Sequence, residues 1–474
     1  MENRQAVKNG MTEAENIRIR LPESVKKIIG TLREKGHEAY AVGGCVRDSI
    51  LGRTPEDWDI TTSALPSEVQ GIFRKTVATG IEHGTVTVLL KDGSSGSLSG
   101  FEVTTYRVDG AYQDGRHPES VRFTPSLSED LRRRDFTINA MAYSDEAGLV
   151  DVFGGVADLR KGIISCVGDP NERFSEDALR ILRAVRFSAQ LGFRIDAGTE
   201  RAIKGHVQNL LKVSRERIQA ELSKLLCSAH PERVSDLFRL SMDIFLCPGF
   251  SALRRDVFEE LQQTAEAPEA GRPAKGKEQR PLFPELPLSE KYLRYAMLLS
   301  DGTSEDAVRL MRGLRLDNDT ISRAEKLVQF LYKPIPAEPY ALKKVMQQMS
   351  PELFRTLLLL KRQFSGTARY RARCRGEEPD QLLKLLSDII RREEPVYLSD
   401  LIIKGKDLLA AGMKPGPEIG SMLSEMLDDV QQNPVHNSVL YLLSRHLCGQ
   451  GYHSEEKKSD ISSIEPFKVW RENT

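Results

Sequence analysis

The sequence has few cysteines, no net charge and no long apolar run. Its six cysteines are scattered over 474 residues without a Cys-x-x-Cys pair, which argues against a zinc site and favours reduced thiols in a cytosol. Lys plus Arg and Asp plus Glu are equal at 68 each, so indiscriminate nucleic-acid binding is not expected, although a local basic face is allowed. No apolar run approaches the ~20 residues of a membrane span, and residues 1–16 are too polar for a signal peptide.

The chain is longer than one hydrophobic core usually allows, so we expect roughly two to four domains. Its apolar fraction of 40% and charged fraction of 29% are typical of a soluble globular protein. Residues 1–16 and 451–474 are polar and are expected to be disordered. Residues 264–287 are rich in Ala, Pro, Glu and Lys and lose helical periodicity, so we expect a linker or insertion there.

A pair of glycines follows a predicted strand. Residues 38–42 are mostly apolar and include β-forming side chains, which predicts a strand. Gly43 and Gly44 then let the backbone approach a ligand where a Cβ would clash. Residues 45–51 predict a short helix whose free N–H groups would face a phosphate, with Arg47 beside them. The stretch therefore predicts a phosphate cradle, although a lone Gly-Gly pair is more often a turn.

Two aspartates follow this cradle. We expect a second strand over 57–60, whose period of two would place Asp57 and Asp59 on one face. Like charges held that close repel each other and call for a cation. Two carboxylates beside a phosphate cradle are what Mg²⁺-assisted phosphoryl or nucleotidyl transfer needs. A lone Asp-x-Asp is more often a solvated loop or cap, so the prediction depends on the combination.

The combination of these features resembles the signature of the nucleotidyltransferase superfamily that includes DNA polymerase β-like enzymes. The features are, in order, a strand, Gly-Gly, Arg-Asp in a short helix, and Asp-x-Asp. More narrowly, the combination resembles the class II tRNA nucleotidyltransferases, or CCA-adding enzymes, and the bacterial poly(A) polymerases. Two further blocks carry the resemblance. Residues 133–142 read Arg-Arg-Asp-Phe-Thr-Ile-Asn-Ala-Met-Ala and match the family block at every position, and residues 176–180 match its Glu-Asp-x-x-Arg motif.

The resemblance implies a role for each matched residue. Glu102, on an expected strand, would be the third carboxylate near the metal; the alternative is a solvent-facing strand residue. Arg134 would touch the nucleotide. The other implied nucleotide-binding residues are Gly43, Gly44, Arg47, Asp177, Arg180, Arg183 and Arg186. In the helix expected over 176–187, Asp177 with Arg180 would select the base, whereas an arginine face alone is usually structural. The two later arginines would hold the triphosphate or the helix itself.

The base-selecting motif has a direct physical basis. Cytosine and adenine present an amino donor beside a ring acceptor, whereas guanine and uracil present a carbonyl acceptor beside an N–H donor. A carboxylate only accepts hydrogen bonds and a guanidinium only donates them. Asp177 with Arg180 therefore fits C and A and opposes G and U, so that a pair of side chains replaces a nucleic-acid template.

The resemblance also implies the fold class, which is α+β. We expect a polymerase-β-like nucleotidyltransferase head with a mixed sheet of about five strands, followed by an all-helical neck, body and tail. The head would span 20–150 and the neck, which recognises the base, 151–230. The body would span 231–380, and the tail, which binds tRNA, 381–450.

The implied function is template-independent addition of C, C and A to the 3′ end of tRNA from CTP and ATP, with release of pyrophosphate. Mg²⁺ held by Asp57 and Asp59, joined by Glu102, would be the cofactor. The enzyme would be cytoplasmic, with no membrane partner. Alternatives within the family add only CC, only A or poly(A). A further alternative is a catalytically inactive RNA-binding protein, against which the complete Asp-x-Asp argues.

One feature of many relatives is missing from this sequence. They carry an appended phosphohydrolase domain with a His-Asp metal pair. Here Ser300 stands where that His would precede Asp301, and no His lies between His230 and His436. We therefore expect neither 2′,3′-cyclic phosphodiesterase nor phosphatase activity.

Residues 107–126 predict a long polar loop, and such loops usually signal function or disorder. C and A differ in size, so one pocket has to adjust between the second and third additions. A flexible polar segment tied to the catalytic sheet suits that task. Residues 114–118 read Asp-Gly-Arg-His-Pro, which resembles the Asp-Gly-Arg-x-Pro-like loop of complete CCA-adding enzymes. An ordinary surface loop is the alternative.

Deletion of residues 111–116 should leave CC addition intact and block addition of the final A, because only the last step needs the adjusted pocket. Sequencing of the products formed from tRNA, CTP and ATP measures this, and a tRNA ending in CC isolates the last step. A deletion variant that makes CCA at the normal rate, or loses CC addition equally, would show that the loop is not the switch.

Overall fold

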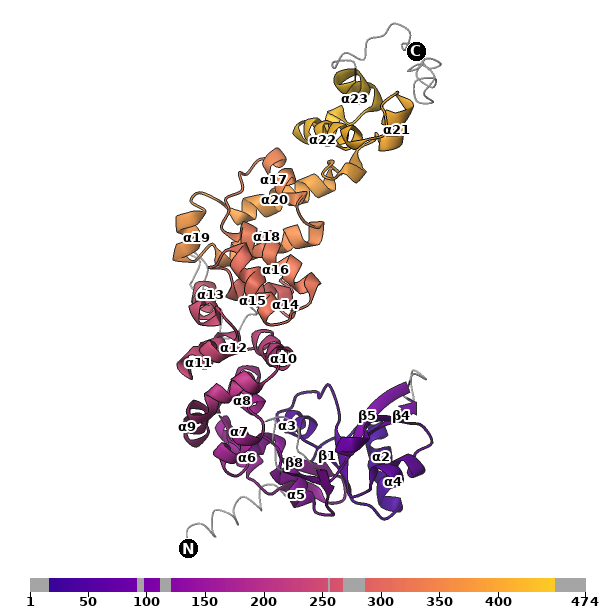
Figure 1. Ribbon diagram of the computed structural model, residues 1–474, viewed down its shortest axis with the longest axis vertical. Coiled ribbons are helices and arrows are strands. Elements are labelled where there is room, and N and C mark those ends of the chain that lie inside the picture. Colours follow the sequence, from indigo (N-terminus) through magenta and orange to yellow (C-terminus); the bar gives the residue numbers. More distant parts are fainter. Residues whose placement is uncertain (1–16, 92–97, 111–120, 255, 267–285, 448–474) are drawn as a thin grey trace. The chain divides into compact units, whose positions relative to one another are not determined.

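The computed structural model describes residues 17–91, 98–110, 121–254, 256–266 and 286–447 (Figure 1). The chain divides into two compact units. Unit 1 comprises Met1–Asp256, Ser289–Tyr295 and Val308–Ile321, and unit 2 comprises Val257–Leu288, Ala296–Ala307 and Ser322–Thr474. No helix in the described ranges is long and apolar enough to cross a membrane.

Four segments singled out in the sequence fall wholly or largely outside the described residues. They are the polar ends at 1–16 and 451–474, the loop residues 111–116 and most of the insertion at 264–287. At the base of the loop, β6 (Arg107–Asp109) pairs with β7 (Val121–Phe123) in an antiparallel ribbon. The loop predicted over 107–126 therefore begins and ends in paired strands.

Unit 1 contains a seven-stranded sheet with the order β3-β4-β5-β2-β1-β8-β9. The pairing of β2 with β5 is parallel and the other pairings of this sheet are antiparallel, which confirms the mixed sheet. The strands are β1 (Ala39–Val42), β2 (Ile60–Thr62), β3 (Thr76–Gly80), β4 (Thr85–Lys91), β5 (Leu98–Thr105), β8 (Met141–Ser144) and β9 (Gly148–Asp151).

The sheet has two strands more than the sequence predicts, namely β8 and β9. All four residues of β8 are buried, so no alternation of polar and apolar side chains marks this strand. It follows the 3₁₀ turn η2 (Thr137–Asn139) and pairs with β1. The strand predicted over 57–60 is also wrong in its bounds, because β2 begins only at Ile60 and both aspartates precede it.

The helices of unit 1 begin with α2 (Glu23–Glu34), an amphipathic helix that buries Val25, Ile28, Ile29 and Leu32. The next is α3 (Gly44–Ile50), close to the predicted 45–51. The others are α4 (Pro66–Ile72), α5 (Leu127–Arg132), α6 (Gly155–Lys161), α7 (Pro170–Glu176), α8 (Leu179–Leu191), α9 (Ala197–His206), α10 (Arg215–Leu226), α11 (Ser235–Arg239) and α12 (Asp243–Leu246). A small parallel pair joins β10 (Ile163–Ile164) to β11 (Arg194–Ile195).

The single helix predicted over 176–187 is two helices. Asp177 separates α7 from α8 in an extended conformation, with φ −140° and ψ 105°. Its side chain accepts a hydrogen bond from the Leu179 backbone N–H at 3.0 Å. An aspartate that caps the following helix in this way favours a break between two helices. The apolar stripe over residues 179–187 belongs to α8 and gives no sign of this break.

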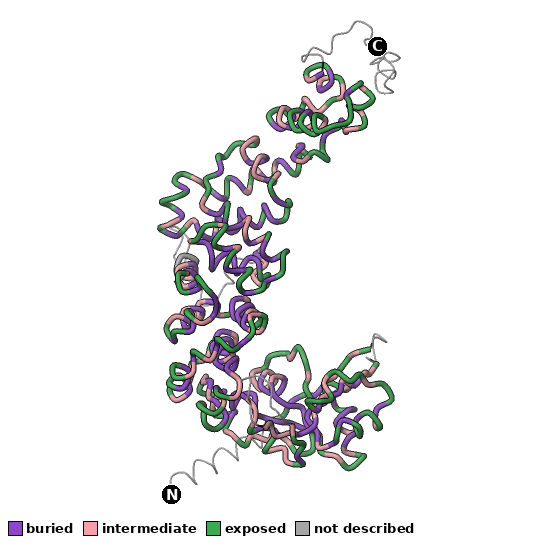
Figure 2. The backbone as a smooth tube through the Cα atoms, viewed as in Figure 1, coloured by how far each residue is buried: buried purple, intermediate pink, exposed green. Residues whose placement is uncertain are grey.

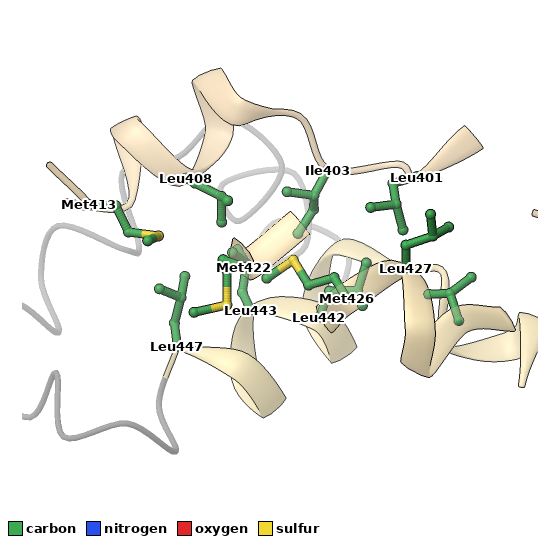
Figure 3. Close-up of a cluster of buried hydrophobic side chains, with 11 residues drawn as sticks. Leu401, Ile403, Leu408, Met413, Met422, Met426, Leu427, Leu442, Leu443 and Leu447 are labelled. Carbon is green, nitrogen blue, oxygen red and sulfur yellow. The ribbon is translucent and has the colours of Figure 1, made fainter. Parts of the chain in front are cut away.

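Every regular element after residue 256 in the described ranges is a helix. Strands β1, β2 and β8 and helix α8 of unit 1 are mostly buried, whereas exposed positions recur along the helices after residue 400 (Figure 2). Helices α21 (Gly405–Ala410), α22 (Pro417–Gln432) and α23 (Val439–His446) pack around one apolar cluster that includes Leu408, Met426 and Leu442 (Figure 3). The helices are α13 (Val257–Glu266), α14 (Lys291–Leu298), α15 (Ser304–Gly313), α16 (Asn318–Leu331), α17 (Pro339–Met346), α18 (Pro351–Phe364), α19 (Ala368–Arg373), α20 (Pro379–Arg391), α21 (Gly405–Ala410), α22 (Pro417–Gln432) and α23 (Val439–His446).

Gly155 at the start of α6 should not tolerate a side chain. A Cβ built there would lie 2.4 Å from the Thr137 carbonyl oxygen and 2.9 Å from Met141 Sδ. Because the carbonyl belongs to the backbone, Gly155→Ala should cost roughly 1–3 kcal/mol of unfolding free energy, measured by denaturant or thermal melting. Gly205→Ala is the matched control, since a Cβ at this position of α9 meets open space and alanine favours helix. If the two variants have the same unfolding free energy, a Cβ at residue 155 is not crowded by Thr137 and Met141.

Candidate active site

Three carboxylates meet where β2 and β5 run parallel. Ile60 pairs with Val103, so Asp59 and Glu102, each one residue earlier, lie beside each other. Partial desolvation and the Asp59 and Asp57 carboxylates raise the pKa of Glu102. Partial desolvation also raises the pKa of Asp59, and Asp57 adds to the effect. The structure therefore brings the three predicted acidic residues together as one negatively charged site.

The three carboxylates are suited to a metal ion that takes its other ligands from water and substrate phosphates. Within the described part of the chain, no group of three or more His, Cys, Asp or Glu side chains is arranged to hold a metal. Mg²⁺ commonly takes one or two carboxylates and completes its shell with water and substrate phosphates. Asp57 and Asp59 are both exposed and can supply two carboxylates, while Glu102 adds to the negative potential around them.

Arg134 lies beside this acidic site at the end of β1. Gly43 has a φ of +83°, and a Cβ there would lie 2.9 Å from Arg134 Nη1, so glycine is required for two reasons. Burial lowers the pKa of Arg134, and its charge offsets part of the rise in the pKa of Asp59. Its buried Nε has no hydrogen-bond partner among the described residues. A desolvated cation with an unused donor is suited to an anionic phosphate.

Asp130, which the sequence analysis did not single out, holds the arginine block in place. Its side chain is fully buried and lies 2.7 Å from Arg133 Nη2 and 3.6 Å from Arg134 Nη2. It accepts hydrogen bonds from the Thr61 hydroxyl at 3.1 Å and the Arg107 backbone N–H at 3.4 Å. Burial alone would raise the pKa of Asp130, but the two guanidinium groups lower it. The available sequence signal was its i,i+3 and i,i+4 spacing from these arginines.

Arg47 is engaged within the protein. Its guanidinium donates to both carboxylate oxygens of Asp48, at 2.9 and 2.8 Å, and to Asn139 Oδ1 at 2.6 Å. Asn139 in turn donates to Asp135 Oδ1 at 3.2 Å. These bonds fix α3 against the block at 133–142. Arg47 therefore links α3 to this block, and its predicted direct contact with a phosphate stays a prediction.

Asp135 links that block to helix α8. Its Oδ2 lies 2.8 Å from Arg183 Nε and 2.6 Å from Arg183 Nη2. Although burial alone would raise the pKa of Asp135, Arg183 lowers it to about 2. Arg183 and Arg186 both face Glu221 of α10, and Arg186 Nε lies 2.6 Å from Glu221 Oε2. Two of the arginines predicted to bind the nucleotide are therefore already paired with carboxylates.

The ring of Phe187 lies against three guanidinium groups. The distances from its centroid to the guanidinium carbons are 5.2 Å for Arg47, 5.3 Å for Arg183 and 3.8 Å for Arg186. Cation–π attraction of this kind is worth roughly 0.5–2 kcal/mol for each contact. The ring of Phe187 in α8 thus helps to hold Arg47 of α3 against α8.

The two predicted base-selecting residues are not paired with each other. Asp177 accepts hydrogen bonds from Arg217 Nη1 at 3.3 Å and Arg217 Nη2 at 2.8 Å. Arg180 donates to Glu176 Oε2 at 2.5 Å and to the Arg133 carbonyl at 2.9 Å. Both residues therefore lie near the block at 133–142 and the α7–α8 break, each held by its own partner.

Helix α10 supplies two residues that the sequence analysis missed. Arg217 and Glu221 are four residues apart and lie on one face of the helix. That face meets Asp177 and the α8 arginines, and α10 packs along α8 (Figure 1). The sequence offered only an i,i+4 pair on a charged helix, which does not reveal the element against which it packs.

Family models match most of the described chain. Residues 39–165 match the poly A polymerase head domain, and residues 192–253 match the model described as "Probable RNA and SrmB- binding site of polymerase A". Residues 289–444 match domain 2 of tRNA nucleotidyltransferase. The first of these models spans the carboxylates, Gly43 and the arginine block.

Whole-length relatives are CCA-adding enzymes. That of Limosilactobacillus fermentum is 34% identical over 426 residues, or 89% of this chain and 95% of that protein. That of Lactiplantibacillus plantarum is 37% identical over 419 residues, or 88% and 93%. The crystal structure of the Bacillus stearothermophilus CCA-adding enzyme in complex with CTP is similar with a TM-score of 0.71 and 29% identity, covering 90% of this chain and 97% of that one.

Stability should depend on the ionisation of Asp135. Its pKa of about 2 lies below the ordinary 3.8, so its contribution is complete above about pH 4 and is lost as the pH falls toward about 2. Asp135→Asn should lower the unfolding free energy at neutral pH by about 2–3 kcal/mol and flatten this acid dependence. Denaturant melts across the same pH range measure both effects.

Asp145→Asn is the matched control for this variant. The Asp145 side chain is 47% exposed and faces Lys26 at 3.4 Å, so its loss should change the unfolding free energy by less than about 1 kcal/mol. If Asp135→Asn is as stable as the unmodified protein at neutral pH, the ion pair with Arg183 does not stabilise the fold.

Proposed function

The chain belongs to the family of CCA-adding enzymes, and we propose how its residues add C, C and A to the 3′ end of tRNA from CTP and ATP. Each addition joins the RNA 3′-oxygen to the α-phosphorus of the nucleotide and releases pyrophosphate. The observation that carries the proposal is the meeting of Asp57, Asp59 and Glu102 with the Arg134 guanidinium. A nucleoside triphosphate and its metal need such a pairing of acidic and basic groups.

Nucleotidyltransferases of this family generally use a divalent metal, and we assign Mg²⁺ to Asp57 and Asp59. The pKa values of Asp59 and Glu102 are raised by desolvation and by repulsion from the neighbouring carboxylates, and a bound cation would relieve the repulsion. When bound, the metal would lower the pKa of the RNA 3′-hydroxyl and neutralise charge on the departing pyrophosphate. The protein's own contribution is to hold Asp57 and Asp59 just before β2, beside Glu102 within the paired strand β5.

The triphosphate is assigned to the wall formed by Gly43, Gly44 and Arg134. The glycines leave the backbone uncovered at the start of α3, and Arg134 offers its unpartnered Nε. The three arginines around Phe187 are already paired with carboxylates or amide oxygens. We therefore assign them to hold α3 and α8 in place, instead of binding the triphosphate directly.

Asp177 and Arg180 are assigned to the edge of the incoming base. The Asp177 carboxylate would accept a hydrogen bond from the amino group of C or A, and Arg180 would donate to the adjacent ring acceptor. Arg180 donates to Glu176 Oε2. We infer that it exchanges this partner for the base, because a guanidinium has several donors in a fixed plane.

We propose that the head (20–150), neck (151–230), body (231–380) and tail (381–450) follow one another along the chain. The order of the matched family models along the chain supports this division, although their bounds differ. The tail is assigned to tRNA binding. The cytoplasm is the proposed location, because tRNA, CTP and ATP meet there.

Product sequencing tests the complete reaction. A tRNA that ends at the discriminator base, incubated with CTP and ATP, should gain C, C and A and then stop. Addition of CC alone, of A alone to a CC end, or of a long run of A would identify the corresponding relative instead. Absence of any extension would identify an inactive RNA-binding protein.

Asp57→Ala and Asp59→Ala are the inactive controls for this experiment. Each should abolish incorporation of both nucleotides while leaving the melting temperature nearly unchanged, because removal of one of two like charges seldom destabilises a protein. Glu56→Ala removes an exposed neighbouring charge and should remain active. Retained turnover in either aspartate variant would overturn the metal assignment.

A further inference from the structure

We propose that Arg217 of α10 is a positioning residue that enforces base selection by fixing the Asp177 carboxylate. The inference rests on the proposed function, in which Asp177 reads the base. It goes beyond that function because it assigns part of the selectivity to a residue that need not touch the nucleotide.

The hydrogen bonds around Asp177 leave little freedom to its carboxylate. Oδ1 accepts from the Leu179 backbone N–H at 3.0 Å and from Arg217 Nη1 at 3.3 Å. Oδ2 accepts from Arg217 Nη2 at 2.8 Å. An ionised carboxylate has about four acceptor sites, and these contacts among the described residues occupy three of them. One site on Oδ2 is left for a base.

Arg217 suits this task by its geometry and its surroundings. Its fork donates to both oxygens at once, which fixes the plane of the carboxylate as well as its position. The Arg217 and Asp177 side chains are only 23% and 16% exposed, so water competes weakly for the pair. Helix α10 is itself held against α8, where Glu221 faces Arg183 and Arg186.

A fixed carboxylate discriminates between bases in a way that a mobile one does not. U and G carry a ring N–H donor beside their carbonyl, whereas C and A carry an amino donor beside a ring acceptor. A carboxylate that is free to turn or shift by the width of one ring position can accept the N–H of U or G. Arg217 prevents that adjustment, so the wrong base meets a carbonyl opposed to a carboxylate.

The test compares Arg217→Ala and Arg217→Lys with the unmodified chain. The kcat and KM are measured for CTP and UTP on tRNA that lacks CCA, and for ATP and GTP on tRNA that ends in CC. For Arg217→Ala, the preference for CTP over UTP and for ATP over GTP, as ratios of kcat/KM, should each fall roughly tenfold. Turnover with CTP and ATP should change much less.

The lysine variant keeps the charge but offers a single ammonium donor instead of the forked guanidinium. It also serves as the control in case Arg217→Ala does not fold. It should recover part of the lost preference. Arg239→Ala is the matched control, because it removes an arginine of the same unit that pairs with Asp236 and Glu200, away from Asp177. Its nucleotide preferences should match those of the unmodified chain.

A double variant tests whether Arg217 acts through Asp177. If it does, Asp177→Ala combined with Arg217→Ala should be no less selective than Asp177→Ala alone. Additive losses of selectivity would overturn the proposal. So would equal losses of turnover with all four nucleotides in the Arg217 variants, since that result indicates a structural role only.

The same measurements separate this inference from the proposed function. If Asp177→Ala relaxes selection and Arg217→Ala does not, the inference on Arg217 is wrong and the function stands. If Asp177→Ala leaves base selection unchanged, or if the unmodified chain does not add C, C and A, then both the proposed function and the inference on Arg217 are wrong.

Discussion

Pairing of arginine with buried carboxylates is the interaction on which the site depends. Asp130 holds Arg133 and Arg134, and Asp135 holds Arg183. A buried carboxylate without its partner would be costly, so each pair fixes the elements that carry its members. In this way the arginine block, α3 and α8 are held in one arrangement before any nucleotide binds. Preorganised charge of this kind is what makes electrostatic catalysis effective.

The site uses carboxylates in two opposite environments. Asp57, Asp59 and Glu102 face a common site, where partial desolvation and repulsion between the carboxylates raise the pKa values of the last two. Asp130 and Asp135 are buried and neutralised by guanidinium groups, which lowers their pKa values. The first set is suited to receive a cation and the second to hold the architecture. The same side-chain type therefore serves chemistry or structure according to its surroundings.

The features that sequence reasoning predicted correctly are local ones. The short helix α3 and the strand carrying Glu102 each follow from a short pattern of side chains, whereas the mixed sheet was implied by the family resemblance. The fully buried β8 has no such pattern and was missed. The spacing of Asp130 from Arg133 and Arg134 was visible in the sequence but was overlooked. The role of Arg217 depends on which distant elements pack together, and no spacing within one segment reveals that. The α7–α8 break was missed because the apolar stripe masked the capping role of Asp177.

The parallel pairing of β2 with β5 has a consequence for the order of folding. Residues 60–62 join residues 103–105, whereas β4 and β5 form a hairpin of near neighbours. Local hairpins close quickly, and parallel strands distant in sequence close late because the intervening chain must be ordered first. The three acidic side chains converge only through that late contact. A chain in which this contact has not yet closed lacks the assembled cation site, because Glu102 reaches the two aspartates only through it.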